Sequence, residues 1–163
     1  METYEQLLDQ GERLVRSGDQ VAGVRKYARA AELDPKRKEA FTKLGLVYRE
    51  YGDVDSAMNF FAQAASLDEK DAFVRFNLGL IQYGEGMLDR ARETLEEAVS
   101  IVQTGIAGAR VEAEGLRSDK QGILLHQCDE LEQTVVDAQA LLAQIATDQA
   151  ATPESGFASG QAG

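Results

Sequence analysis

The sequence predicts an all-α protein in which three helix–turn–helix units stack on one another. Three observations predict this fold. Apolar residues recur at helical spacing, a set of small and large residues repeats every 34 positions, and only two prolines interrupt the 163 residues. The repeat is plainest in LGLVYREYG at 44–52 and LGLIQYGEG at 78–86. Repeats of this length build stacked folds, because one unit cannot bury its apolar face alone.

Five positions of the repeated unit carry the same kind of residue in every copy. A small residue comes eighth, a glycine fifteenth, a second small residue twentieth, a large apolar residue twenty-fourth and an alanine twenty-seventh. In that order the residues are Gly11, Gly45 and Gly79; Gly18, Gly52 and Gly86; Gly23, Ala57 and Ala91; Tyr27, Phe61 and Leu95; and Ala30, Ala64 and Ala98.

Each of these positions has a mechanical role in a pair of helices. Glycine at the fifteenth position accepts a left-handed backbone, so it ends the first helix and lets the chain turn. Small residues at the eighth and twentieth positions let two antiparallel helices approach closely, and the large residue at the twenty-fourth fills the gap beside them. Asp34-Pro35 closes the first unit, because proline stops a helix.

This pattern resembles the tetratricopeptide repeat, a family with a period of about 34 residues. The resemblance covers about residues 4–101, as units 4–37, 38–71 and 72–101, and implies a right-handed α-solenoid. The best copy is the second unit, which carries Phe41, Leu44, Gly45, Tyr48, Gly52, Ala57, Phe61 and Ala64.

Three positions depart from the family pattern. Glu69 replaces the closing proline of the second unit, Arg75 stands where a large aromatic residue is usual, and Gly23 replaces an alanine. These departures are local and leave the three units in register.

The resemblance implies that the first helix of each unit lines a concave, partner-binding groove. The first unit contributes mostly acidic residues, and the groove then becomes apolar and aromatic. Lys43 and Arg49 are expected to steer an acidic flank of the partner. The full set of expected partner-binding residues is Lys43, Leu46, Arg49, Phe73, Phe76, Asn77, Leu80 and Tyr83.

The aromatic stripe of the third unit has more than one interpretation. Its members share one helix face at spacings of three and four residues, and they are Phe73, Phe76, Leu80 and Tyr83. The stripe is either a site for an apolar peptide or partner helix, or core that the chain's own following helices cover. A mixed case has the C-terminal segment covering the stripe until a partner displaces it.

One binding mode of the family is not expected here. The clamp that holds the carboxyl-terminal tails of heat-shock chaperones uses Lys, Asn and Arg at these groove positions. Leu8 and Glu12 stand where Lys and Asn would be, and Phe73 and Asn77 stand where Lys and Arg would be. An acidic first unit would repel a carboxylate rather than hold it.

Residues 102–148 predict a long C-terminal helix or a helical hairpin. Apolar residues continue in steps of three and four from Val99, so the last repeat helix is expected to run to about residue 116, although Gly105 and Gly108 weaken a helix. SDKQ at 118–121 has the form of a capping box, which starts a new helix. An apolar seam follows in Leu124, Cys128, Leu131, Val135, Ala138, Leu142 and Ile145.

This coiled-coil seam either packs back on the preceding helix, as a hairpin, or is shared by two chains in a homodimer through residues 119–146. The tail at 149–163 is expected to be disordered, because small polar residues bury too little apolar surface to offset the entropy lost on ordering. Its one large apolar residue is Phe157.

No catalytic, metal or cofactor site is predicted. The one histidine, His126, precedes the one cysteine, Cys128, by two residues, so the two side chains point apart on a helix. Cys128 lies on the seam and His126 lies opposite it, which favours a core and a solvated position respectively. No phosphate-binding loop or nucleophile motif is present. We therefore expect no enzymatic activity.

Charge and composition limit the partners and the compartment. A net charge of −11 argues against nucleic acid, which needs a basic footprint. No stretch is long and apolar enough for a membrane span, and the acidic N-terminus does not resemble a signal peptide. A single cysteine suits a reducing compartment. These features predict a cytoplasmic protein.

The expected function is that of an adaptor or scaffold that binds a peptide or helix of a partner protein in the concave groove. One alternative is a chaperone that shields an apolar segment of a secreted or assembling protein. Bacterial secretion chaperones of this size carry an extra helix before the first repeat, whereas the first repeat here begins at about residue 4. The other alternative is a self-assembling structural protein that uses its C-terminal helices.

Overall fold

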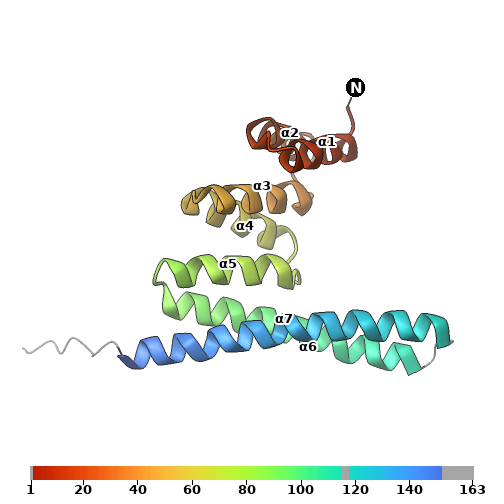
Figure 1. Cartoon of the computed structure of the whole chain (residues 1–163), viewed down its shortest axis with the longest axis vertical. Helices are drawn as coiled ribbons and strands as arrows, with labels where there is room; N and C mark the ends of the chain where they lie inside the picture. Colours follow the sequence, from red (N-terminus) through yellow and green to blue (C-terminus); the bar gives the residue numbers. More distant parts are fainter. Residues whose placement is uncertain (1, 115–117, 152–163) are drawn as a thin grey trace, which may run out of the picture.

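The computed structural model of the chain describes residues 2–114 and 118–151, with side chains described outside 118–131 and 134. All the secondary structure of this part is helical, and the helices stack in chain order (Figure 1). They are α1 (Tyr4–Arg16), α2 (Gln20–Leu33), α3 (Lys38–Tyr51), α4 (Val54–Leu67), α5 (Ala72–Gly84), α6 (Leu88–Glu114) and α7 (Ser118–Ala151). The predicted all-α solenoid of helix pairs is confirmed.

The turn inside each pair depends on glycine at the fifteenth position. Gly52 ends α3 with a φ of 75°, and Gly18 and Gly86 adopt φ values of 90° and 72°. Only glycine adopts this left-handed conformation without a steric penalty. Asp19 and Asp53 follow two of these glycines and accept a hydrogen bond from the backbone of the next helix, so each turn is also a helix start.

The helices of each pair lie close together at the eighth position. A Cβ atom added to Gly11 would lie 2.5 Å from the ring of Tyr27, and one added to Gly45 would lie 3.0 Å from the ring of Phe61. The predicted partnership between a small and a large residue therefore holds in the structure. The alanines at the twenty-seventh position are also buried, which leaves a narrow core between the two helices of a pair.

Neighbouring pairs bury a second set of apolar side chains between them. Phe41, Phe61, Val74 and Ile81 form one cluster that joins the second unit to the third. Leu7 and Ala40 belong to a cluster between the first and second units. The core therefore runs along the stack rather than lying at one centre, as expected for a repeat protein.

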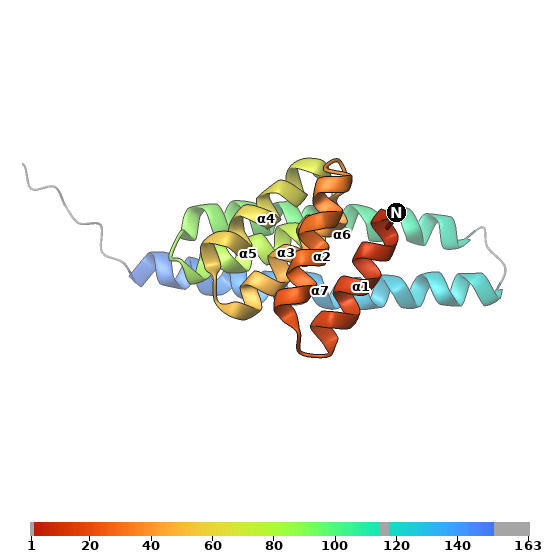
Figure 2. The ribbon, with the colours of Figure 1, turned by 90° about the horizontal axis from the view of Figure 1, so that it is seen from above.

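The C-terminal third is a long antiparallel hairpin. α6 continues 27 residues, through Gly105 and Gly108, and α7 folds back along it for 34 residues (Figures 1 and 2). Val135 packs with Val102 and Ile106, so this part of the seam is used inside the chain. The end of α6 at Glu114 agrees with the expected extension to about residue 116.

Some expectations concern residues at the edges of the described structure. The expected boundary between residues 101 and 102 falls inside α6, and α7 continues to Ala151, past the start expected for the tail. Phe157 and residues 152–163 lie outside the described residues. The side chains of Leu124, His126, Cys128 and Leu131 also lie outside them.

Candidate partner-binding groove

The expected partner-binding residues lie on two neighbouring helices of the stack. Three of them belong to α3 and the other five to α5. We call the surface formed by the second, fifth, sixth, ninth and twelfth positions of α1, α3 and α5 the groove face. On this face Leu46 and Leu80 are half-buried at the same position of successive units, and Phe73 is 52% exposed.

A hydrogen bond between two side chains of the groove face connects α3 to α5. Arg49 donates a hydrogen bond to the side-chain oxygen of Asn77, and Asn77 donates to the carbonyl oxygen of Phe73 at 2.8 Å. Asn77 is only 3% exposed, so its amide has exchanged water for these two partners. Asn77 is thus positioned to hold Arg49 rather than to meet a ligand directly.

An ion pair connects α1 to α3. Lys43 lies 3.6 Å from a carboxylate oxygen of Glu12, whose other oxygen lies 2.7 Å from Arg16. The ammonium group of Lys43 is therefore partly neutralised by the first unit. Lys43 is expected to steer an acidic partner, and in the structure Glu12 competes with such a partner for the Lys43 ammonium group.

α7 covers one side of the aromatic stripe. Phe76 and Tyr83 pack with Leu141, Leu142 and Ile145 of α7 in one cluster. A void of about 10 Å³ beside Phe76 is closed by residues of α5, α6 and α7. The stripe therefore divides into a covered part and an exposed part, which contains Phe73.

The end of α7 is held by polar contacts as well as by apolar packing. The hydroxyl of Tyr83 donates to Asp148 at 2.8 Å, and this bond raises the pKa of Tyr83. Gln149 donates to Asp89 at 2.8 Å at the start of α6. The heptad pattern placed Leu142 and Ile145 on the seam, and Asp148 follows one turn later, but no sequence signal paired it with Tyr83.

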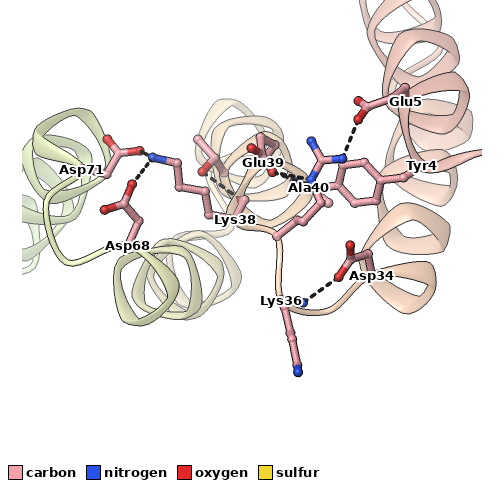
Figure 3. A network of polar contacts seen from close by, with 11 residues as sticks. Tyr4, Glu5, Asp34, Lys36, Lys38, Glu39, Ala40, Asp68 and Asp71 are labelled. Carbon is pink, nitrogen blue, oxygen red and sulfur yellow. Dashed lines mark hydrogen bonds and ion pairs between the residues drawn. The ribbon is translucent and has the colours of Figure 1, made fainter.

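Ion pairs and hydrogen bonds also connect neighbouring units. Figure 3 shows Lys38 between Asp68 and Asp71, with its nitrogen 2.5 and 2.6 Å from their carboxylates. The hydrogen bond from Lys38 lowers the pKa of Asp68. These ion pairs join the start of α3 to the turn between α4 and α5. Sequence reasoning did not single them out, because each charge taken alone resembles ordinary surface.

The junction between the first and second units is built around Tyr4. Its hydroxyl accepts a hydrogen bond from the backbone of Ala40 at 3.0 Å (Figure 3), and the guanidinium of Arg37 lies 4.0 Å from its ring centroid. Arg37 also pairs with Glu5 and Glu39. Glu5, one of the acidic groups expected to make the first unit repulsive, is thus partly neutralised.

The described side chains, in residues 2–114, 132–133 and 135–151, include no group of three His, Cys, Asp or Glu arranged to hold a metal ion. None of the helices in that part combines the length and the apolar character that crossing a membrane requires.

The family model for the tetratricopeptide repeat matches residues 48–114, from the end of α3 to the end of α6. A search of the curated proteins found no sequence that matches this chain. The chain is similar to a structure in a type III secretion (T3SS) complex from Aeromonas hydrophila, with 16% identity and a TM-score of 0.71 over 91% of this chain and 84% of that chain.

Two further structures are similar. SycD, the type III secretion translocator chaperone of Yersinia enterocolitica, in complex with a peptide of the translocator YopD, is 18% identical with a TM-score of 0.68 over 89% of this chain and 93% of that chain. YrrB, a TPR protein with an unusual peptide-binding site, is 26% identical with a TM-score of 0.56 over 62% of this chain and 52% of that chain. The repeated residues, the helix pairs that they form and the family match over residues 48–114 agree, and the chain has the fold of a tetratricopeptide repeat protein.

Proposed function

We propose that this protein is a cytoplasmic adaptor that binds a peptide or helix of a partner protein on the groove face of α3 and α5. The observation that carries the proposal is the exposure of Phe73, a residue that is 52% exposed although it lies on the same helix face as the half-buried Leu80. Exposing a large apolar ring to water costs free energy that a bound apolar side chain recovers.

The structure suggests which of the expected residues meet the ligand first. Leu46, Phe73 and Leu80 would supply the apolar contact, and Arg49, whose orientation is fixed by Asn77, would donate to a carbonyl or carboxylate of the ligand at the edge. A cation held in place before binding loses less entropy when the ligand arrives. Lys43 would contribute less, because Glu12 already neutralises part of its charge.

Phe76 and Tyr83 belong to this site in a different way. Both pack against α7 in the chain alone, so they would meet a ligand only after α7 moves. In the proposed binding mode they support α5 and the end of α7 while the exposed part of the stripe binds the partner.

Photo-crosslinking tests this function. The photoreactive residue p-benzoylphenylalanine would replace Phe73 in one protein and Tyr51 in another, because Tyr51 is also an exposed aromatic residue (47%) but lies off the groove face. We expect irradiation in lysate of the producing cell to yield a defined crosslinked protein with the label at 73 and not at 51. Equal crosslinking at both positions, or none at 73, would contradict the adaptor function.

A chaperone is the second candidate, and one observation favours it. The similarity to the secretion chaperone SycD with its bound peptide extends over 89% of this chain, so it includes part of the C-terminal hairpin as well as the repeats. The two functions differ in what happens to the partner. If the protein crosslinked at Phe73 is insoluble when expressed alone and soluble when co-expressed with this chain, the chaperone is favoured; unchanged solubility favours the adaptor.

A further inference from the structure

α6 carries a second helix face that the chain does not cover. At spacings of three and four residues it consists of Ile101, Thr104, Gly105, Gly108, Val111 and Glu112, and we call it the outer face of α6. The seam residues Val102 and Ile106 point instead toward α7. The second half of α6 extends beyond the stack of α1 to α5 (Figures 1 and 2).

An exposed valine, Val111, and a hollow lie at opposite ends of the outer face, and we call the Val111 side chain the knob. Val111 is 71% exposed, the highest value among the exposed large apolar residues of the described chain. Between about 9 and 16 Å earlier along the axis, Lys70 of the α4–α5 turn borders a hollow of about 390 Å³, lined also by Ser100, Ile101, Thr104 and Gly105. Because both features lie on one rigid helix, Val111 cannot enter the hollow of its own chain.

A second copy of the chain satisfies both features at once. If two α6 helices pack antiparallel about a twofold axis near Gly108, Val111 of each copy meets the hollow of the other. Such an interface is self-complementary, and the same contact is made twice. A knob that enters a hole formed by four residues of a facing helix is the usual packing of two helices in close register.

The charges of the outer face fit the same arrangement. Lys70 lies at the hollow, and Glu112 directly follows the knob. Neither takes part in an ion pair with another described side chain, in residues 2–114, 132–133 and 135–151. In the antiparallel pair the Glu112 of one copy lies beside the Lys70 of the other, so two ion pairs form across the interface. In a chain with a net charge of −11, such local complementarity offsets the general repulsion between copies.

The glycines at the centre of this face, Gly105 and Gly108, leave room for a helix of another chain to pack against α6. A Cβ atom added to Gly105 or Gly108 would meet nothing within 4 Å in the chain itself. Each glycine nevertheless costs a helix about 1 kcal/mol relative to alanine. The fold of one chain therefore gives no packing reason for either residue, whereas a second helix would gain a close contact with the backbone.

We propose that the protein forms a twofold homodimer through the outer face of α6, with Val111 of each copy in the hollow of the other. The dimer uses α6 rather than the expected seam at 119–146, because the described seam residues Val135, Ala138 and Ile145 are already buried in the chain. The groove face lies on other helices and remains open in the dimer.

Mass measurement with matched variants tests the proposal. In light scattering and sedimentation over a range of concentrations, we expect a dimer for the unmodified protein. Val111→Lys should weaken dimerisation at least tenfold, while Val21→Lys, at a valine of α2 that is also mostly exposed (59%), should leave it unchanged. Circular dichroism verifies that both variants keep their helices.

Charge exchange supplies an independent test. Lys70→Glu and Glu112→Lys alone should each weaken the dimer, and the double variant should restore it, because the ion pairs reform with reversed signs. A protein that stays monomeric at all concentrations would overturn the proposal. So would a dimer that tolerates Val111→Lys, or a double variant that is weaker than both single variants, because then another surface or another partner uses the contact.

Discussion

Each helix pair is shaped by one residue without a side chain and one with a large ring or branched chain. The ring of Tyr27 occupies the space where a Cβ atom of Gly11 would stand, and the ring of Phe61 does the same at Gly45. Tyr27 and Phe61 are 2% and 0% exposed. The distance between the helices therefore depends on both members, and changing either one costs packing.

Gly11→Ala and Gly108→Ala are expected to change the free energy of unfolding in opposite directions. The new methyl group at position 11 would lie 2.5 Å from Tyr27, so we expect a loss of about 1–3 kcal/mol. At position 108 the methyl group meets nothing within 4 Å, and we expect a gain of about 0.5–1 kcal/mol from helix propensity. Urea unfolding at concentrations where the chain is monomeric measures both; equal effects would contradict the close approach at Gly11.

Ionisation of Tyr27 should make the free energy of unfolding depend on pH in alkaline solution. Burial, with a smaller effect from Glu12, raises the pKa of Tyr27 to about 12, above the value of about 10 for an exposed phenol. The unfolded chain therefore loses this proton first, and stability should be complete below pH 10 and fall as the pH rises toward 12. The expected loss is about 1.4 kcal/mol per pH unit over this window.

Tyr27→Phe removes this proton and should flatten the corresponding part of the stability curve. Tyr51→Phe is the control, because Tyr51 is exposed. Unfolding at pH 9, 10 and 11 compares the three proteins. A slope that is identical in the unmodified protein and in Tyr27→Phe would show that Tyr27 ionises alike in the folded and unfolded chains.

Between elements, ion pairs and hydrogen bonds fix how one unit sits on the next. Lys38 is the clearest example, because it holds Asp68 and Asp71 at once and is 29% exposed. A pair that is partly shielded from water is worth more than one on open surface. Arg37 joins the first two units in a similar way through Glu5 and the ring of Tyr4.

Lys38→Ala should lower the free energy of unfolding by about 1 kcal/mol, since it leaves two neighbouring carboxylates without their shared cation. Arg29→Ala should change it by less than about 0.5 kcal/mol, because the Arg29–Glu32 pair is two-thirds exposed. Thermal unfolding at low and high salt compares them. Equal effects would mean that the Lys38 junction is only a surface contact.

The C-terminal hairpin is the other main contact between elements. Ile145 is 0% exposed and packs with Leu95 and Ala91, so Ile145→Ala should cost about 2–5 kcal/mol. Val136→Ala, at a valine that is 54% exposed, should cost less than about 0.5 kcal/mol. Denaturant titration distinguishes the two. An Ile145→Ala protein of undiminished stability would show that α7 is loosely held and leaves the stripe on α5 free.

At the scale of the whole molecule, the protein is a short stack whose last unit is closed by its own hairpin. A solenoid must cover the apolar face of its terminal repeat, and α7 does so over Phe76 and Tyr83. Phe73 on the same helix stays exposed, which is why the proposed ligand contact centres on Phe73 with the half-buried Leu46 and Leu80.

Much of this fold could be predicted because a residue type that recurs every 34 positions makes the same contact in each unit. Gly18, Gly52 and Gly86 marked the turns correctly, since a positive φ demands glycine. Heptad spacing likewise placed Val135 and Ile145 on the face of α7 that is buried. In both cases a local rule determined the outcome.

The candidate site was less predictable, because its state depends on contacts between distant residues. Helical spacing placed Phe73 and Phe76 on one stripe, but could not tell that α7 covers Phe76 and leaves Phe73 exposed. The bond between Tyr83 and Asp148 joins residues 65 positions apart. Such pairings depend on how far α6 extends before the chain reverses.

The most direct test of the proposed function measures affinity for one ligand. A peptide from the partner crosslinked at Phe73 would be titrated by calorimetry into the unmodified protein, Phe73→Lys and Tyr51→Lys. We predict binding at least tenfold weaker for Phe73→Lys, about 1.4 kcal/mol or more, and within twofold of the unmodified protein for Tyr51→Lys. Equal affinity for all three would contradict the groove face as the binding site.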